Sequence, residues 1–338
     1  MEIEARVVRL HLAETFVIAR EATDHADVVQ VAIHHADATG YGEAAPIARY
    51  AESVGSASRF VEEHAELVGD DPFALEEIGG RFARIPGEQA AKAAIDGALH
   101  DLQGKLLDVP VHRLLGLPRG GPPTSWTVWL GDPDDMARRA ETAAHTFGRL
   151  KLKLGGGDGL DVERVRAVRS VTELPLQVDV NEWWSLDEAF DALPQLATLG
   201  IEYCEQPLRA GDEGGAELRE RSPIPIYVDE DCHVLSDVER CAGIAHGINI
   251  KLAKSGGIRE ALRMAHAARA LGLGVMLGCM VESGLAIAAG CCVAPLCDHV
   301  YLDGNLLLRE DPCPGVVLVD GVQIPSTAPG LGVSVAES

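Results

Sequence analysis

The pattern of hydrophobic and polar positions changes near residue 118 of the chain. Within residues 1–50, β-branched stretches such as residues 27–33 are interrupted by glycines, a pattern typical of antiparallel strands. Residues 56–115 are instead rich in Ala, Leu and Glu at helical spacing. The first 118 residues are therefore predicted to form an α+β module.

A second pattern follows, in which short apolar runs alternate with segments of helical periodicity such as residues 187–199 and 258–271. The runs end near Leu130, Leu154, Val180, Glu205, Asp229, Lys251, Met280 and Asp303. The steps between these ends are 24, 26, 25, 24, 22, 29 and 23 residues. An open doubly wound sheet seldom needs eight such even units. We therefore expect the α/β class, with a (β/α)8-type barrel over residues 119–311.

Composition agrees with a folded globular protein of this size. The 338 residues suit a barrel and a smaller module, and 47% hydrophobic with 24% charged residues is typical of a globular protein. The formal net charge of −23 arises from 52 acidic and 29 basic residues. Such a surface repels phosphate backbones, so nucleic acid is not expected as a partner.

Targeting signals and cysteine motifs are also not evident. Glu2 and Glu4 stand where a secretory signal would carry a basic stretch. Residues 283–297 form an apolar stretch of 15 residues with two glycines and a proline, which suits a buried helix better than a membrane span. The eight cysteines follow residue 203 without CxxC spacing. We therefore expect reduced thiols, a cytoplasmic location and no membrane partner.

Lysines stand at two predicted strand ends, where barrel enzymes carry their catalytic groups. The second run ends Leu-Lys-Leu-Lys, and alternation places Lys151 and Lys153 on one face. A barrel strand has no solvated edge, so these side chains should enter the barrel mouth. The sixth run ends in Lys251 and lies across the barrel from the second. Lys153 and Lys251 are therefore expected to face each other.

One carboxylate ends each of the next three runs: Asp179, Glu205 and Asp229. Three converging carboxylates raise one another's pKa unless a cation lies between them. Mg²⁺ prefers such ligands, with water or substrate oxygen in its remaining positions. Asn181 shares the face of Asp179 and is expected to support a ligand from behind. Glu230 and Asp231 remain alternatives to Asp229.

This arrangement predicts proton chemistry beside a carboxylate. A metal that binds a substrate carboxylate stabilises the enediolate left when the α-proton departs. A lysine crowded by other cations has a lowered pKa and can act as a base. Two lysines on opposite faces allow removal of a proton on one side and its return on the other. A barrel that binds a metal and an anion without turnover is the alternative from another class.

Five motifs in order make the chain resemble the muconate-lactonising subgroup of the enolase superfamily. They are Lys151-x-Lys153, Asp179-x-Asn181, Glu205-Gln206-Pro207, Val228-Asp229-Glu230 and Asn249-Ile250-Lys251-x-x-Lys254-x-Gly-Gly. The resemblance covers nearly the whole chain, because residues 90–98 and 42–44 are similar to that family's capping domain. It implies a capping domain over residues 1–118, completed by the C-terminal segment 312–338.

The resemblance also implies roles for these residues. Asp179, Glu205 and Asp229 would hold Mg²⁺, and Lys153 with Lys251 would form the acid/base pair. Lys151 would polarise the substrate carboxylate and lower the pKa of Lys153. Mandelate-racemase-like dehydratases carry a histidine on the seventh strand, and residues 274–283 contain none. Acid-sugar dehydration is therefore disfavoured.

Within the subgroup, residues 277–283 and 302–307 are similar to dipeptide epimerases of the L-Ala-D/L-Glu type. Those enzymes use Asp-x-Asp on the eighth strand to hold the dipeptide ammonium group, and this chain has Tyr301-Leu302-Asp303. Trp129 is bulkier than the residue expected at its position. The resemblance predicts a set of substrate-binding residues: Asp303, Tyr301, Arg20, Glu282 and Trp129. Of these, Arg20 is equally compatible with an ordinary surface arginine.

The expected function is a magnesium-dependent dipeptide epimerase, an isomerase that inverts the α-carbon next to the metal-bound carboxylate by two-lysine 1,1-proton transfer. A muconate-type cycloisomerase or an N-acylamino acid racemase would use the same catalytic set. The expected partner is a small carboxylate substrate. Whether the chain forms a homo-oligomer is left open by the sequence.

Overall fold

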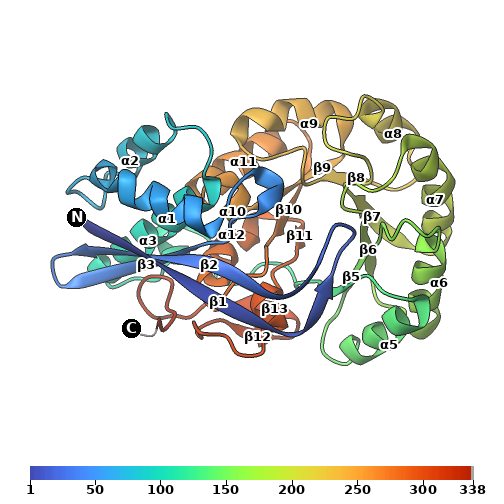
Figure 1. The fold of residues 1–338 in the computed structure, drawn as a ribbon, viewed down its shortest axis with the longest axis horizontal. Helices are drawn as coiled ribbons and strands as arrows, with labels where there is room; N and C mark the ends of the chain where they lie inside the picture. Colours follow the sequence, from blue (N-terminus) through green and yellow to red (C-terminus); the bar gives the residue numbers. More distant parts are fainter. Residues whose placement is uncertain (336–338) are drawn as a thin grey trace.

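The computed structural model describes residues 1–335. Figure 1 shows an α+β part at the left, which carries the N-terminus, and a curled β/α part at the right. The first part contains the antiparallel strands β1 (Glu2–Val17), β2 (Ala22–His35) and β3 (Ala38–Ala44). Its helical segments are η1 (Ala48–Tyr50), α1 (Val54–Glu63), η2 (Ala65–Val68), α2 (Leu75–Phe82), α3 (Gln89–Leu107) and α4 (Val111–Leu114).

Close packing of α3 against the sheet holds this part together. β2 is the central strand, and its alternate residues Val29 and Val31 are fully buried in a cluster shared with the α3 alanines. At Gly42 on β3, a Cβ would lie 2.0 Å from the carbonyl oxygen of Ala94 on α3. Only glycine allows this approach, because any larger residue would push β3 away from the helix.

Eight parallel strands form the second part: β4 (Trp126–Val128), β5 (Leu150–Lys153), β6 (Leu176–Asp179), β7 (Ile201–Glu205), β8 (Ile226–Val228), β9 (Gly247–Lys251), β10 (Gly274–Gly278) and β11 (His299–Val300). They are hydrogen-bonded in sequence order from β4 to β11. A parallel bridge between Thr124 and Val300 joins the two ends of the sheet. The predicted fold class, a (β/α)8-type barrel with an α+β capping part, is confirmed.

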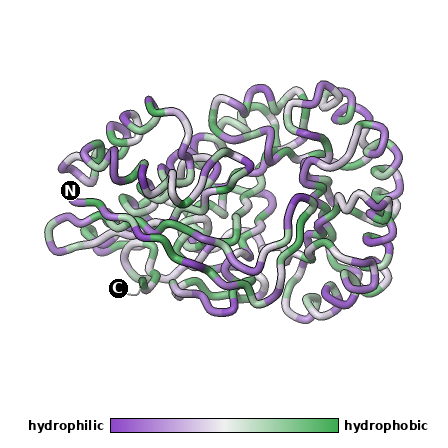
Figure 2. Tube along the Cα trace, in the orientation of Figure 1, coloured by the Kyte–Doolittle hydropathy of each residue, from purple (hydrophilic) through white to green (hydrophobic). Residues whose placement is uncertain are grey.

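Helices surround the strands: α5 (Pro133–Ala143), α6 (Asp161–Val171), α7 (Leu186–Thr198), α8 (Gly215–Arg221), α9 (Val238–Ile244), α10 (Leu252–Ser255), α11 (Ile258–Ala270) and α12 (Gly284–Val293). Hydrophobic and hydrophilic stretches alternate along the outer ones (Figure 2). Leu150 and Leu152 of β5 pack against residues of α5 and α6. Lys151 and Lys153 therefore point to the opposite side of the strand, into the barrel.

The segment of residues 283–297 forms α12 and the 3₁₀ segment η4 (Ala294–Leu296). Leu285 and Ile287 are fully buried in the barrel wall, as expected for a helix without a solvated face. Among residues 1–335, no helix is long and apolar enough to cross a membrane. All eight cysteines are free and buried.

The C-terminal segment returns to the first part of the chain. It contains η5 (Gly304–Leu307) and the short hairpin β12 (Val317–Val319) and β13 (Val322–Ile324). The backbone N–H of Leu331 then donates to the Asp101 carboxylate on α3, at 2.7 Å. The domain boundaries at residues 118 and 311 stay a prediction, and residues 336–338 of the predicted completing segment lie outside the described residues.

The connection between β1 and β2 reaches over the barrel mouth. Figure 1 shows this end of the hairpin beside the strands β5 to β7. The backbone N–H of Leu130, which follows β4, donates to the carbonyl of Val17 at 3.0 Å. The hairpin thus places residues 18–21 above the ends of the barrel strands.

Candidate active site

The predicted catalytic residues of β5, β6 and β7 stand level with one another. In the sheet register, Lys153 lies opposite Asp179, and Asp179 lies opposite Glu205. Lys153 Nζ donates to Asp179 Oδ2 at 2.7 Å. Lys151 Nζ lies 3.1 Å from Asp179 Oδ2 and 2.5 Å from Glu205 Oε2. The structure therefore brings both lysines of the Lys-x-Lys motif against two of the three predicted metal ligands.

The third carboxylate, Asp229, follows β8 and is held by two lysines from the next strand and helix. Lys251 Nζ lies 2.8 Å from Asp229 Oδ2, and Lys254 Nζ lies 2.6 Å from Asp229 Oδ1. Lys254 Nζ also donates to the carbonyl of Asp229 at 2.7 Å and that of Asn249 at 2.9 Å. All three Lys254 protons are thus used by the protein, which makes this lysine a support for Asp229.

Sequence reasoning assigned no role to three residues that fix the carboxylates. One is Lys254, described above. Asn249 Nδ2 donates to Glu205 Oε1 at 2.7 Å. Gln206 Oε1 accepts from the backbone N–H of Asp229 at 2.9 Å. The signal was present, because all three stand in the motifs that carry the family resemblance.

Electrostatics at the carboxylates follow from these contacts. Burial raises the pKa of Asp179, but the ammonium groups of Lys151 and Lys153 outweigh it and hold the pKa below its usual value. The pKa of Asp229 is lowered in the same way, with its own pair of lysines outweighing burial. Burial and the neighbouring Asp179 charge raise the pKa of Glu205. The two aspartates are therefore the more firmly ionised members of the set.

The pKa values of the three lysines are shifted by the same two effects, burial and neighbouring charges. Burial lowers the pKa of Lys151, but the two carboxylates beside it outweigh burial and raise the pKa well above its usual value. Lys251 behaves likewise because of Asp229. Burial lowers the pKa of Lys153, Asp179 offsets part of this, and the other two ammonium groups add to it. Lys153 thus releases its proton more readily than Lys151 or Lys251.

The donor set fits a hard divalent cation. Glu205 Oε2 is buried and has the Lys151 ammonium group as an ionic partner at 2.5 Å, in a geometry that makes no hydrogen bond. Within residues 1–335, no three His, Cys, Asp or Glu side chains are placed to hold an ion as they stand, and the Lys151 ammonium group lies between two of the carboxylates. Carboxylate oxygens on adjacent strands are the ligands that Mg²⁺ prefers. The residues therefore fit Mg²⁺, and their roles as ligands stay a prediction.

A cavity of about 440 Å³ lies between the capping part and the barrel. Barrel residues Lys153, Asp229 and Lys251 line it from below, and Phe16 and Tyr50 of the capping part line it on the other side. Lys153 of β5 and Lys251 of β9 therefore open onto the same space. That volume suits a small molecule with a few polar groups.

The predicted substrate residues fall into two groups. Arg20 and Tyr301 line the cavity, whereas Asp303, Glu282 and Trp129 are not among its lining residues. The Lys151 ammonium group lies 3.9 Å from the centre of the Tyr301 ring, a cation–π contact.

Asp303, Glu282 and Trp129 are all buried. Asp303 is 0% exposed, and its Oδ2 accepts from the backbone N–H of Thr127 at 2.7 Å. Burial, with the Glu43 charge beside it, raises the pKa of Glu282 to about 8. The ring of Trp129 lies 6.3 Å from that of Phe16, so Trp129 supports a cavity wall from behind.

Asn181 contacts both Asp179 and Lys153, and its supporting role stays a prediction. Its backbone N–H donates to Asp179 Oδ1 at 3.0 Å, and its Oδ1 lies 3.4 Å from Lys153 Nζ. Its φ of 51° is left-handed, as is the φ of 72° at Glu182. Asn tolerates this conformation, whereas Glu adopts it only when its surroundings hold it there.

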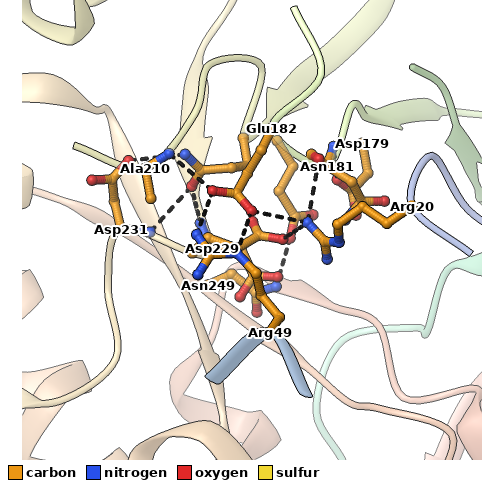
Figure 3. A network of polar contacts seen from close by, with 12 residues as sticks. Arg20, Arg49, Asp179, Asn181, Glu182, Ala210, Asp229, Asp231 and Asn249 are labelled. Carbon is orange, nitrogen blue, oxygen red and sulfur yellow. Dashed lines mark hydrogen bonds and ion pairs between the residues drawn. The ribbon is translucent and has the colours of Figure 1, made fainter. Parts of the chain in front are cut away.

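Two arginines of the capping part meet Glu182 at the edge of the site (Figure 3). Arg49 donates to both carboxylate oxygens of Glu182, at 2.8 and 2.7 Å. Arg20 donates through Nη1 to Glu182 Oε2 at 3.0 Å and to Glu230 Oε1 at 2.8 Å. Burial raises the pKa of Glu182, but Arg49 outweighs it, so the pKa lies below its usual value. Glu182 is thus an ionised carboxylate shared by two arginines.

Family models match both parts of the chain. Residues 135–338 match the enolase C-terminal domain-like family, and residues 2–116 match the mandelate racemase / muconate lactonizing enzyme N-terminal domain. The chain is 39% identical to L-Ala-D/L-Glu epimerase of Bacteroides thetaiotaomicron, over 96% of this chain and 85% of that protein.

Solved structures are similar over the whole length. A dipeptide epimerase from Enterococcus faecalis, complexed with Mg and the dipeptide L-Leu-L-Tyr, has a TM-score of 0.94 and 31% identity, covering 98% of this chain and 99% of that one. N-succinyl Arg/Lys racemase from Bacillus cereus has a TM-score of 0.93 and 30% identity, covering 99% and 96%.

Proposed function

Since this chain belongs to the mandelate racemase / muconate lactonizing enzyme family of the enolase superfamily, we propose that it is a dipeptide epimerase that uses two lysines. It is an isomerase of the racemase and epimerase class, and it is magnesium-dependent. The observation that carries the two-lysine proposal is the opening of Lys153 and Lys251, from opposite barrel strands, onto one cavity. A cytoplasmic location is proposed with it, because all eight cysteines are free thiols.

Asp179, Glu205 and Asp229 would hold Mg²⁺, which stabilises negative charge on the substrate carboxylate when the α-proton leaves. The protein's own groups move the proton. A neutral lysine amine on one face takes the proton from the α-carbon of the C-terminal residue, and the ammonium group on the other face returns one. Lys153 and Lys251 are these two groups.

Other residues of the chain hold this pair in place. Lys151 lies against Glu205 and the Tyr301 ring, which fixes a positive charge beside the substrate carboxylate. Its charge also favours the neutral form of Lys153. The capping residues Phe16 and Tyr50 line the cavity and would exclude water from a bound substrate.

Exchange with solvent tests this proposal directly. The enzyme with Mg²⁺ is incubated with L-Ala-L-Xaa dipeptides in D₂O, and the α-proton of the C-terminal residue is followed by NMR together with formation of the D-epimer. We expect magnesium-dependent loss of that proton and gain of the epimer. A folded, magnesium-loaded protein that exchanges no dipeptide α-proton refutes dipeptide epimerisation.

N-acylamino acid racemisation is a second candidate, favoured by the end of β11. A dipeptide carries an ammonium group that needs an acidic partner. Tyr301 is neutral, and Asp303 is fully buried, with its Oδ2 accepting from the backbone N–H of Thr127. The similarity to N-succinyl Arg/Lys racemase supports this candidate.

Asp303→Asn separates the two candidates. If Asp303 holds an ammonium group, the substitution raises KM for dipeptides far more than for N-acylamino acids. Equal effects on both substrate types, with N-acylamino acids turned over faster by the wild type, favour the racemase.

A further inference from the structure

Arg20 lines the capping side of the cavity onto which Lys153 and Lys251 open, and the protein itself supplies its anionic partners. Its Nη1 donates to Glu230 Oε1 at 2.8 Å, to Glu182 Oε2 at 3.0 Å and to the carbonyl of Asn181 at 3.3 Å. The Arg20 side chain is 31% exposed, whereas the side chains of Glu182 and Glu230 are 8% and 1% exposed. The carboxylates therefore approach Arg20 from the protein side and are buried there.

Glu182 is the centre of this arrangement, as Figure 3 shows. It joins two separate capping segments, because Arg20 follows β1 and Arg49 belongs to η1. On the barrel side, the backbone N–H of Ala210 donates to Glu182 Oε1 at 3.0 Å. One carboxylate thus fixes the position of the Arg20 guanidinium relative to both the cap and the barrel.

The charges around this end of the cavity oppose an anionic ligand. Arg20 and Arg49 face the carboxylates Glu182 and Glu230, and Glu21 also lines the cavity. A further carboxylate would share an arginine that Glu182 already engages, and it would lie close to that ionised carboxylate. Acidic side chains are therefore disfavoured at this position.

The walls of the same cavity are apolar. Phe16 and Ile18 line it from the hairpin, and Met280, Val281 and Leu307 line it from the barrel. Apolar walls stabilise a bound side chain in proportion to the apolar area removed from water. These apolar walls themselves offer no hydrogen-bond or ionic partner to a charged side chain.

From these contacts we propose that Arg20 serves the ion-pair network of the protein rather than the substrate, so that the epimerised residue carries an uncharged, largely apolar side chain. Glu182 is the positioning residue that keeps Arg20 in this network. The inference rests on the proposed epimerase function and narrows its substrate class. It also replaces the expectation that Arg20 binds the substrate.

The test compares L-Ala-L-Gln with L-Ala-L-Glu, which differ in charge and hardly in shape, and adds L-Ala-L-Leu as the apolar case. For the wild type, kcat/KM should be at least about tenfold higher for the Gln and Leu dipeptides than for the Glu dipeptide. In Glu182→Gln, the Gln-to-Glu ratio should fall about fivefold or more, because Arg20 loses one anionic partner. A merely structural role of Glu182 would lower both rates and leave the ratio unchanged.

Glu163→Gln is the matched control, because it makes the same charge change at an exposed residue of α6 paired with Arg166 at 3.3 Å. It should leave the ratio at the wild-type value. A wild type that prefers the Glu dipeptide overturns the inference, and an unchanged ratio in Glu182→Gln overturns the role of Glu182. If Glu182→Gln does not fold, the ratio of wild-type kcat/KM values for the Gln and Glu dipeptides still tests the inference.

Failure of the inference is distinguishable from failure of the proposed function. If no dipeptide is turned over but N-acylamino acids are, the dipeptide assignment fails. The same comparison with N-acetyl-Gln and N-acetyl-Glu then tests the role of Arg20. A preference for N-acetyl-Gln supports the inference, and a preference for N-acetyl-Glu overturns it.

Discussion

Replacing Lys254 by methionine should destabilise the protein strongly while keeping the length of the side chain. Lys254 is 2% exposed, and its ammonium group holds Asp229 Oδ1 at 2.6 Å and two backbone carbonyls at 2.7 and 2.9 Å. Removing one partner of a buried ion pair costs about 3–5 kcal/mol, because the remaining charge stays buried without its counter-ion. A loss of this size lowers Tm by about 6–20 °C for a domain of the barrel's size.

Thermal unfolding followed by circular dichroism measures this change, and a double-mutant cycle assigns it. Asp229→Asn removes the charge that Lys254 neutralises, so Lys254→Met should cost much less in that background. Arg166→Met is the control for an exposed pair, since Arg166 lies 3.3 Å from Glu163 with both side chains about half exposed. Its effect should stay below about 1 kcal/mol. Additive effects of Lys254→Met and Asp229→Asn would refute the reasoning, because they would mean that the two groups do not interact.

Three further predictions concern catalysis and pH. Lys153→Ala and Lys251→Ala should each stop epimerisation, as measured by chiral chromatography. Either variant can still exchange the α-proton of one enantiomer in D₂O. Unchanged epimerisation in Lys251→Ala would exclude the two-base mechanism. Chelation should abolish activity and Mg²⁺ should restore it, whereas Glu205→Gln should bind Mg²⁺ at least about tenfold more weakly by calorimetry; an unaltered affinity would remove Glu205 from the ligand set. Because burial raises the pKa of Glu282 to about 8, the folded state holds a proton that the unfolded state releases near pH 4.5, so stability should fall as pH rises from about 4.5 to 8. Glu282→Gln should flatten this fall in a series of Tm measurements, and an identical slope in both proteins would contradict the raised pKa.

The alternation of apolar and polar residues predicted the barrel well, because it is a property of each strand by itself and does not depend on distant contacts. The run ending in Leu150 to Lys153 became β5, with its leucines against the helices and its lysines inside, as alternation required. Asp179, Glu205 and Lys251 are each the last residue of a strand.

Contacts between distant side chains were beyond this kind of reasoning. Asp303 accepts a hydrogen bond from the backbone N–H of Thr127, which lies on β4 at the other side of the barrel closure. The engagement of Arg20 depends on Glu182 and Glu230, which follow two other strands. No pattern within one segment reveals which partner a long side chain will meet. The contacts of Lys254 became interpretable only when Asp229 and Asn249 were placed around it.

The bond between Thr127 and Asp303 also bears on how the chain acquires its fold during synthesis. Its two groups are 176 residues apart in sequence. The bridge between Thr124 and Val300 lies at the same seam, where the first barrel strand meets the last. This contact can form only after residue 303 of 338 has been synthesised. Until then one edge of β4, the first barrel strand, stays unpaired. Closing so long a loop is slow compared with joining neighbouring strands. Ring closure is therefore a late event, and the seam is where a nascent or heated molecule exposes a strand edge to other chains.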